Sequence, residues 1–209
     1  MGRYLLIALA GLLPGLATLV LLSGYFQVNI TQFLPVGWSD QTYYWHQILT
    51  FQKTGFQGGF YTFNEVPPRI ESIHYALWGF PYPAIYGLVA RVVGWETYTG
   101  IFLNMAVMAV CVWACLLLAR FNGRQILLTM LALLAVSPVL MFMPTISQET
   151  FHQAAALILG WAFLTLLQGK PPQNRFFPGL MLIFFIVIAL VRFSWIYLLF
   201  PFWLLLGRK

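Results

Sequence analysis

Residues 176–206 read FFPGLMLIFFIVIALVRFSWIYLLFPFWLLL, an apolar stretch with a single charged side chain, Arg192, near its middle. As one continuous helix this stretch would extend about 46 Å, well beyond the roughly 30 Å of hydrocarbon in a bilayer. An arginine held in continuous lipid is energetically expensive. We therefore expect two shorter helices, 177–191 and 194–206, with a break near Arg192 at the outer boundary of the membrane.

The composition of the whole chain also indicates a membrane protein. Of its 209 residues, 61% are hydrophobic and only 8% are charged, and the mean hydropathy is +0.82. These values lie far outside the range of soluble globular domains. The formal net charge of +6 does not predict a nucleic-acid partner, because the basic residues lie in short tracts at the ends of apolar runs, where they act as topology signals.

The apolar runs predict an all-α fold, a single membrane domain built as a polytopic bundle of about six transmembrane helices. One large segment, residues 27–96, is richer in polar, aromatic and glycine residues, and we expect it to form the first outer loop. Helical patterns within it predict short interfacial helices at 40–52 and 83–93. The six expected spans are 4–26, 97–119, 125–142, 151–167, 177–191 and 194–206.

The distribution of charge predicts the orientation of these spans. Seven of the eleven basic residues fall on one side, which the positive-inside rule makes cytoplasmic, and all five acidic residues fall on the other. Both termini are then cytoplasmic, and the acids point to chemistry on the outer face. We expect an integral, multi-pass protein of the bacterial inner (plasma) membrane rather than of the endoplasmic reticulum. The cytoplasmic basic residues are Arg3, Arg120, Arg124, Lys170, Arg175, Arg208 and Lys209.

Asp40, the only aspartate in the chain, is the first candidate for chemistry. It stands at the expected start of an interfacial helix, where the helix dipole stabilises an ionised carboxylate that can act as a base or as a hard oxygen ligand. Aspartate is also a preferred N-cap, so the residue pattern alone gives capping and catalysis about equal weight.

Several short motifs resemble the C-type membrane glycosyltransferases (GT-C fold), a family that includes the protein mannosyltransferases and the aminoarabinose transferases. They occur in the order that this family shows, with one span before the first outer loop. The motifs are Ser39-Asp40-Gln41 with Tyr44, Gly79-Phe80-Pro81-Tyr82-Pro83, Ser137-Pro138 and Ser147-Gln148-Glu149. Members of the family commonly have more spans and often a C-terminal outer domain, so we expect a fragment or a minimal member.

The resemblance implies a polyprenyl-phosphate sugar donor and an essential acid in the first outer loop, and Asp40 matches that position. Glu65, in an Asn-Glu-Val-Pro-Pro setting, is the second catalytic acid that the resemblance suggests, with Glu71 as its competitor. The neighbours of Asp40 are serine and glutamine, where many members have an adjacent acid. The alternative use of Asp40, Glu71 and His74 is to bind a divalent metal ion, Mg or Mn.

The leaving phosphate needs a cation, and Arg192 suits this role because its planar guanidinium can bind a phosphate through two hydrogen bonds. The alternative roles of Arg192 are snorkelling to the interface or pairing with an acid such as Glu149. Arg69 is a reserve phosphate ligand on the outer side. Glu149 and Tyr44 complete the predicted substrate-binding set.

The sequence thus predicts an enzyme that transfers a sugar from a polyprenyl-phosphate donor to a glycan, lipid or protein acceptor on the periplasmic or lumenal face. The alternative is a non-catalytic or truncated membrane scaffold or subunit with the same fold. Membrane lipids are expected partners of the chain with either function. A small transporter would require ionisable residues at mid-bilayer in several spans and related halves of the chain, and the sequence has neither.

Overall fold

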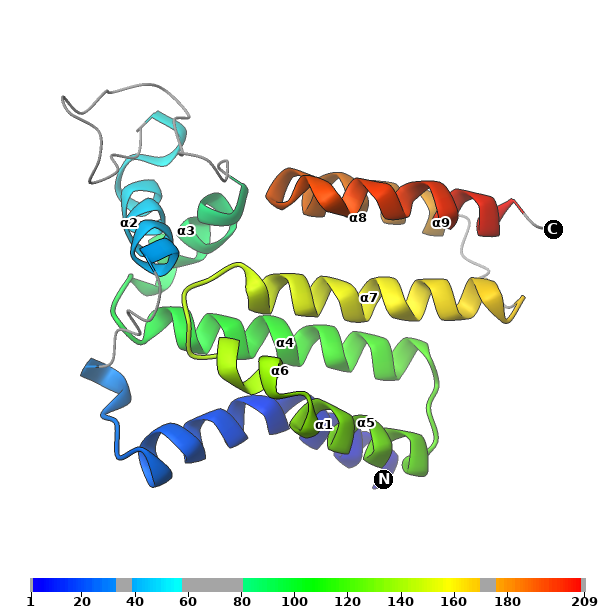
Figure 1. Cartoon of the computed structure of the whole chain (residues 1–209), viewed down its shortest axis with the longest axis horizontal. Coiled ribbons are helices and arrows are strands. Elements are labelled where there is room, and N and C mark those ends of the chain that lie inside the picture. The colour runs from blue at the N-terminus through cyan, green and yellow to red at the C-terminus, as the bar shows by residue number, and fades with distance from the viewer. Residues whose placement is uncertain (1, 33–38, 58–80, 170–175, 208–209) are drawn as a thin grey trace.

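The centre of the bundle is α4 (Thr99–Leu118), which packs between α1 (Gly2–Val20) and α7 (Glu149–Leu167). The computed structural model describes residues 2–32, 39–57, 81–169 and 176–207, and no strand occurs within them. Figure 1 shows these helices as stacked layers, with α1 and α5 below α4 and with α7, α8 and α9 above it. The prediction of an all-helical fold is confirmed for these residues.

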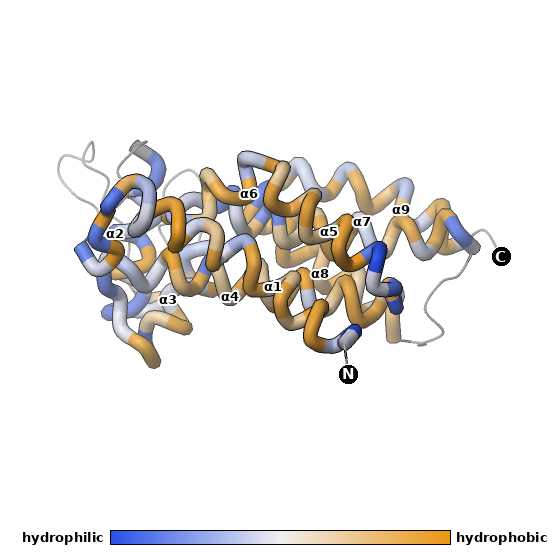
Figure 2. The backbone as a smooth tube through the Cα atoms, turned by 90° about the horizontal axis from the view of Figure 1, so that it is seen from below, coloured by the Kyte–Doolittle hydropathy of each residue, from blue (hydrophilic) through white to orange (hydrophobic). Residues whose placement is uncertain are grey.

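Three helices are long and apolar enough to cross a membrane, and this indicates a membrane protein. They are α4, α7 and the continuous helix Gly2–Tyr25, in which α1 runs on into a π-helical turn, η1 (Leu21–Tyr25). All three overlap spans expected from the sequence, and two of them begin two residues earlier than expected. Their outer faces carry exposed apolar side chains, as lipid contact requires, and Figure 2 shows hydrophobic residues along the length of the bundle.

Glycine lets α1 and α4 approach closely. A Cβ atom at Gly11 would overlap the indole of Trp113, and one at Gly15 would lie 2.6 Å from Cε of Met105. The Trp113 indole also donates a hydrogen bond to the Ala8 carbonyl, at 3.2 Å. Small residues at contacts between transmembrane helices serve this purpose, because packing rather than hydrophobicity holds such helices together in lipid.

The expected span 125–142 differs from the structure, which divides it into α5 (Gly123–Ala135) and α6 (Ser137–Phe142). Val136 leaves the helical conformation between them, with ψ of 89°, and Pro138 lies in the first turn of α6. Proline fits the first turn of a helix but cannot continue the hydrogen bonding of the one before it. With 13 residues, α5 alone extends about 20 Å, short of a full crossing.

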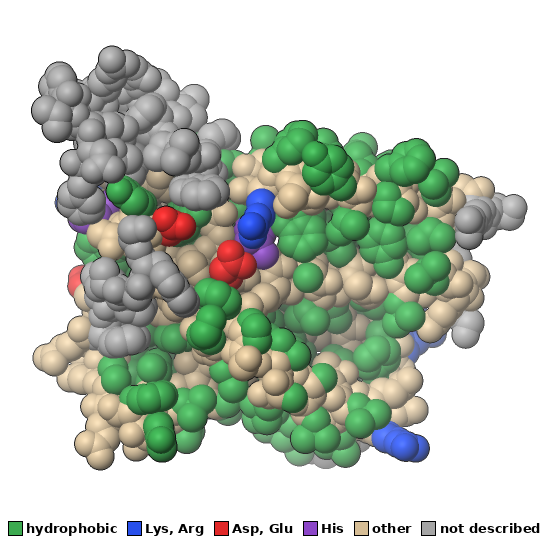
Figure 3. Space-filling view, in the orientation of Figure 1, with side chains coloured by type: hydrophobic (Ala, Val, Ile, Leu, Met, Phe, Trp, Pro, Cys, Tyr) green, Lys and Arg blue, Asp and Glu red, His purple; other side chains and the backbone are tan. Residues whose placement is uncertain are grey.

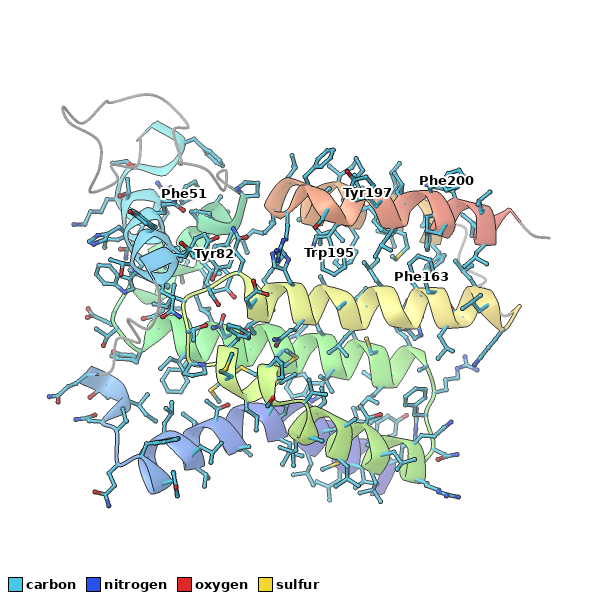
Figure 4. All side chains as sticks on the ribbon, in the orientation of Figure 1. Phe51, Tyr82, Phe163, Trp195, Tyr197 and Phe200 are labelled. Carbon is cyan, nitrogen blue, oxygen red and sulfur yellow. The ribbon has the colours of Figure 1, made fainter. Side chains whose placement is uncertain are left out.

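The predicted break near Arg192 is confirmed. α8 (Phe177–Val191) ends there, Arg192 adopts an extended conformation (φ −147°, ψ 111°), and the chain continues as η5 (Phe193–Leu198), a 3₁₀ helix, and α9 (Leu199–Leu206). Phe202 of α9 packs against Phe185 of α8, with ring centroids 5.3 Å apart, so the chain folds back on itself. Tyr197 and Phe200 point outward from this hairpin in Figure 4.

Two helices lie across one end of the bundle, as the predicted interfacial helices would. They are α2 (Ser39–Thr54), followed by η3 (Gly55–Gln57), and α3 (Pro81–Val93); a further short 3₁₀ turn, η2 (Ile30–Gln32), precedes them. Gln52 of α2 donates a hydrogen bond to the Ala90 carbonyl of α3, at 2.9 Å. Gly94 then ends α3 with a φ of +87°, a conformation that favours glycine.

Candidate functional site

A cavity of about 270 Å³ opens where α2 meets the start of α7 and the break after α8. Figure 3 shows acidic and basic side chains close together on this face of the molecule, beside a histidine. Four separate segments supply the wall, so the site exists only in the folded chain. Its lining residues are Asp40, Gln41, Tyr44, Phe142, Ser147, Gln148, Glu149 and Arg192.

Arg192 and Glu149 face each other across this cavity, with Nη1 of the arginine 3.6 Å from Oε1 of the glutamate. Their side chains are 57% and 41% exposed, respectively. Ion pairs as exposed as this contribute only about 0–1 kcal/mol to stability. Arg192 thus contacts Glu149, which was its alternative role in the sequence analysis. This contact leaves the guanidinium accessible to another anion.

Tyr44 lies beside the charged groups and is itself buried. Burial raises the pKa of its phenol well above the usual value, the negative charges of Asp40 and Glu149 raise it further, and Arg192 opposes them. Tyr44 therefore keeps its proton at physiological pH. A neutral phenol beside two carboxylates can donate a hydrogen bond to a ligand without adding charge to the cavity.

A row of tyrosine rings packs behind Tyr44, on the side away from the cavity. The ring of Tyr44 packs edge-on against Tyr82 of α3, at 5.1 Å between centroids, and Tyr82 packs against Tyr86 at 4.6 Å. The hydroxyl of Tyr82 donates a hydrogen bond to the Ser147 carbonyl, at 3.1 Å. Figure 4 shows Tyr82 at the end of the bundle where α2 and α3 meet the other helices. The helices α2 and α3 are thereby tied to the opposite cavity wall.

Asn104, fully buried in α4, holds the loop that precedes α7. Its amide nitrogen donates to the carbonyls of Met143 and Thr145, at 2.9 and 2.6 Å, and its amide oxygen accepts from the Tyr86 hydroxyl at 2.7 Å. The Thr145 hydroxyl in turn lies 2.8 Å from that of Ser147. One side chain of the central helix thus fixes the backbone that presents Ser147, Gln148 and Glu149 to the cavity.

The turn that carries Arg192 is anchored to α7. The Trp195 backbone amide donates to the Arg192 carbonyl at 3.1 Å, and the Trp195 indole donates to Nδ1 of His152 at 3.0 Å. Figure 4 shows Trp195 between this turn and α7. His152 therefore serves as the hydrogen-bond acceptor that holds this turn against α7.

Four of the predicted site residues, Asp40, Tyr44, Glu149 and Arg192, line this one cavity. The others, Glu65, Arg69, Glu71 and His74, lie outside the described residues. Gln41 and Gln148 also line the cavity but were not predicted as site residues, although both stand in the motifs quoted above. Each stands next to a predicted acid in the sequence, and this position could have identified them as site residues.

The predicted metal site is not tested, because Glu71 and His74 lie outside the described residues. Within the described ranges, no group of three or more histidine, cysteine, aspartate or glutamate side chains is placed to hold a metal ion. Asp40 and Glu149 do line the same cavity, and carboxylate oxygens are the ligands that Mg²⁺ and Mn²⁺ prefer. Two acids provide part of such a coordination shell.

Comparison with known proteins adds no relative. No protein-family model, curated protein or solved structure matches this chain. The resemblance to the C-type glycosyltransferases remains a prediction from short motifs, and the geometry of the cavity is the independent observation that bears on function.

Replacement of Asn104 by leucine should destabilise the protein and loosen the cavity wall. The change removes the buried partner of the Met143 and Thr145 carbonyls and of the Tyr86 hydroxyl. A buried group left unpaired costs about 1–3 kcal/mol in water-soluble proteins and less in membranes. We expect the thermal unfolding midpoint of the purified protein in detergent to fall clearly. Tyr86→Phe, which removes one of the three bonds, should lower it less. Equal midpoints for parent and Asn104→Leu would show that this anchor is unimportant.

Proposed function

We propose that this chain is an integral membrane glycosyltransferase that transfers a sugar from a polyprenyl-phosphate donor to an acceptor on the outer face of the membrane. The observation that supports the proposal is the cavity itself, where α2, the start of α7 and the break at Arg192 bring two carboxylates, a guanidinium and a neutral phenol together. A glycosyl transfer between hydroxyl acceptors and phosphate donors needs these groups: a base for the acceptor and a cation for the leaving phosphate.

In the proposed reaction, the carboxylate of Asp40 takes the proton from an acceptor hydroxyl. The acceptor oxygen attacks the anomeric carbon of the donor and forms the new glycosidic bond. The bond between that carbon and the phosphate oxygen breaks, and the lipid phosphate leaves with its electron pair. The guanidinium of Arg192 stabilises the charge that develops on this oxygen, while the Tyr44 hydroxyl can donate a further hydrogen bond.

Glu149 has a role in keeping Arg192 ready for the phosphate. The two side chains lie 3.6 Å apart, close enough to attract but beyond the length of a strong charge-assisted hydrogen bond. The phosphate of the bound donor carries one negative charge, as a carboxylate does, and gains a second as its bond to the sugar breaks. Arg192 therefore pairs with Glu149 when no donor is bound, and it can transfer its contacts to the phosphate when the donor enters.

The proposal includes six crossings with both termini in the cytoplasm of a bacterium. The guanidinium of Arg3 donates to the Phe121 carbonyl at 3.0 Å, which places the N-terminal end beside the turn between α4 and α5. This turn carries Arg120 and Arg124, and basic turns favour the cytoplasmic side. Figure 1 shows both ends of the chain toward this side of the bundle and α2 and α3 at the opposite side.

The orientation can be tested with cysteines placed at two exposed positions in a background lacking Cys111 and Cys115. A membrane-impermeant thiol reagent applied to intact cells should label a cysteine at Thr54, at the end of α2, because that helix faces the outside. A cysteine at Arg124 should react only after the cells are opened. Labelling of Arg124→Cys but not Thr54→Cys on intact cells would invert the topology and place the cavity in the cytoplasm.

The ion pair between Arg192 and Glu149 is the one observation that suits the alternative, a non-catalytic scaffold of the same fold. A scaffold, however, gains little from an exposed pair. It has no need for Asp40 and Tyr44 in the same cavity. A sugar-transfer assay with purified protein and a panel of polyprenyl-phosphate sugars distinguishes the enzyme from the scaffold, because only the enzyme transfers sugar.

The change Asp40→Asn should abolish most of this transfer and leave the fold intact. Asparagine has the same size and a similar preference for the first turn of a helix, but it cannot accept the acceptor's proton. Loss of a positioned base costs about 100- to 10,000-fold in rate, so we expect a fall in that range in the transfer assay.

Glu96→Gln is the matched control for this change, since Glu96 is an exposed acid between α3 and α4 that does not line the cavity. It should transfer sugar at close to the parent rate. If Asp40→Asn unfolded at the parent temperature and also kept the parent rate, the Asp40 carboxylate would not be the base, and the proposed mechanism would be wrong.

A further inference from the structure

Two glutamine side chains in the cavity wall are buried, and their amide groups have atoms with no hydrogen-bond partner among the described residues. Gln41 is 3% exposed and Gln148 is 5% exposed. Both the nitrogen and the oxygen of the Gln41 amide, and the nitrogen of the Gln148 amide, lack a hydrogen-bond partner among the described residues. A buried polar group left unpaired costs free energy, so most native examples have a partner that is protein, water or ligand.

Burial without a partner does not by itself indicate a ligand site, because Gln47 of α2 has the same property away from the cavity. Gln41 and Gln148 differ from Gln47 in their position. They reach the same cavity from two segments, α2 and the residue just before α7, and each stands next to an acid of the site, Asp40 or Glu149. Glutamine has several rotatable bonds, so an amide in a cavity wall can turn toward a ligand while its helix stays in place.

The chemistry of these amides defines what they can bind. A primary amide presents donors and an acceptor without charge, and a hydroxyl group likewise donates and accepts. The charged groups of the cavity serve a phosphate and a proton, whereas the amides match the hydroxyls of a sugar ring. The cavity volume, about 270 Å³, lies just below the 300–1,000 Å³ or so of sites for drug-sized ligands, which suits a single monosaccharide.

We propose that Gln41 and Gln148 form the sugar-recognition subsite of this cavity and bind hydroxyl groups of one monosaccharide unit. The inference rests on the proposed function and deepens it, because it names residues that select the sugar apart from those that carry out the transfer. Phe142, which also lines the cavity, adds an apolar wall against which the C–H groups of a sugar ring can pack. The lipid chain of the donor lies outside this small cavity.

The subsite can be tested by binding, without any transfer. The purified full chain is kept in a zwitterionic, sugar-free detergent, because glycoside detergents would compete, and is titrated with a panel of methyl hexosides and methyl pentosides. Binding is followed by saturation-transfer NMR. Gln41→Met and Gln148→Met retain the length of the side chain and remove the amide, and each should weaken binding of the preferred glycoside about 10-fold, the effect of one lost hydrogen bond.

Gln47→Met is the matched control, with the same substitution on the same helix at a buried glutamine outside the cavity. It should bind the glycoside as the parent does. All three variants should unfold at or above the parent temperature, because an apolar side chain of similar shape relieves an unpaired buried amide. Inorganic phosphate should bind the two cavity variants as it binds the parent, since they leave Arg192 unchanged.

The results distinguish this subsite from the proposed function. Sugar transfer by the parent, with glycoside affinity unchanged in Gln41→Met and Gln148→Met, would overturn the subsite and leave the function standing. Glycoside binding that fails in those two variants alone, in a protein that transfers no sugar, would support the subsite and overturn the function. Equal losses in all three glutamine variants, or a parent that binds none of the glycosides, would also overturn the subsite.

Discussion

The structure depends on keeping the charged guanidinium of Arg192 out of the hydrocarbon of the membrane. The residues on either side of it are apolar enough for lipid, but a guanidinium at the depth of the hydrocarbon costs several kcal/mol. The chain resolves this conflict by ending α8 at Val191 and folding back through η5 and α9. The same break brings the arginine to the end of the bundle where α2 begins, and this makes a polar cavity possible there.

Once Arg192 lies at that end, hydrogen bonds between distant segments set the shape of the cavity. Asn104 of the central helix fixes the backbone of residues 143–145, and Trp195 attaches the turn after Arg192 to His152. The tyrosine rings of α2 and α3 complete the support. These contacts attach the segments that line the cavity to α3, α4 and α7, so the position of the charged groups is linked to the packing of the bundle.

The features that the sequence predicted were local ones. Unbroken apolar runs predicted α1, α4 and α7, the spacing after Pro83 predicted α3, and the isolated charge of Arg192 predicted the end of α8. The division into α5 and α6 was missed because the apolar run continues through Pro138, and hydropathy does not register a lost hydrogen bond. The roles of Asn104 and of the buried amides at Gln41 and Gln148 depend on contacts between residues far apart in the sequence, which no local pattern predicts.

Asp40 and Arg192, far apart in the chain, share one cavity. Cross-linking of paired cysteines measures this proximity. In a protein lacking Cys111 and Cys115, we expect a short bifunctional thiol reagent to join Asp40→Cys to Arg192→Cys efficiently, as detected by mass spectrometry of the digested protein. Asp40→Cys paired with Arg124→Cys, at the other end of the bundle, should give no such product. A cross-link between positions 40 and 192 no more frequent than that background would show that the two residues do not share a cavity.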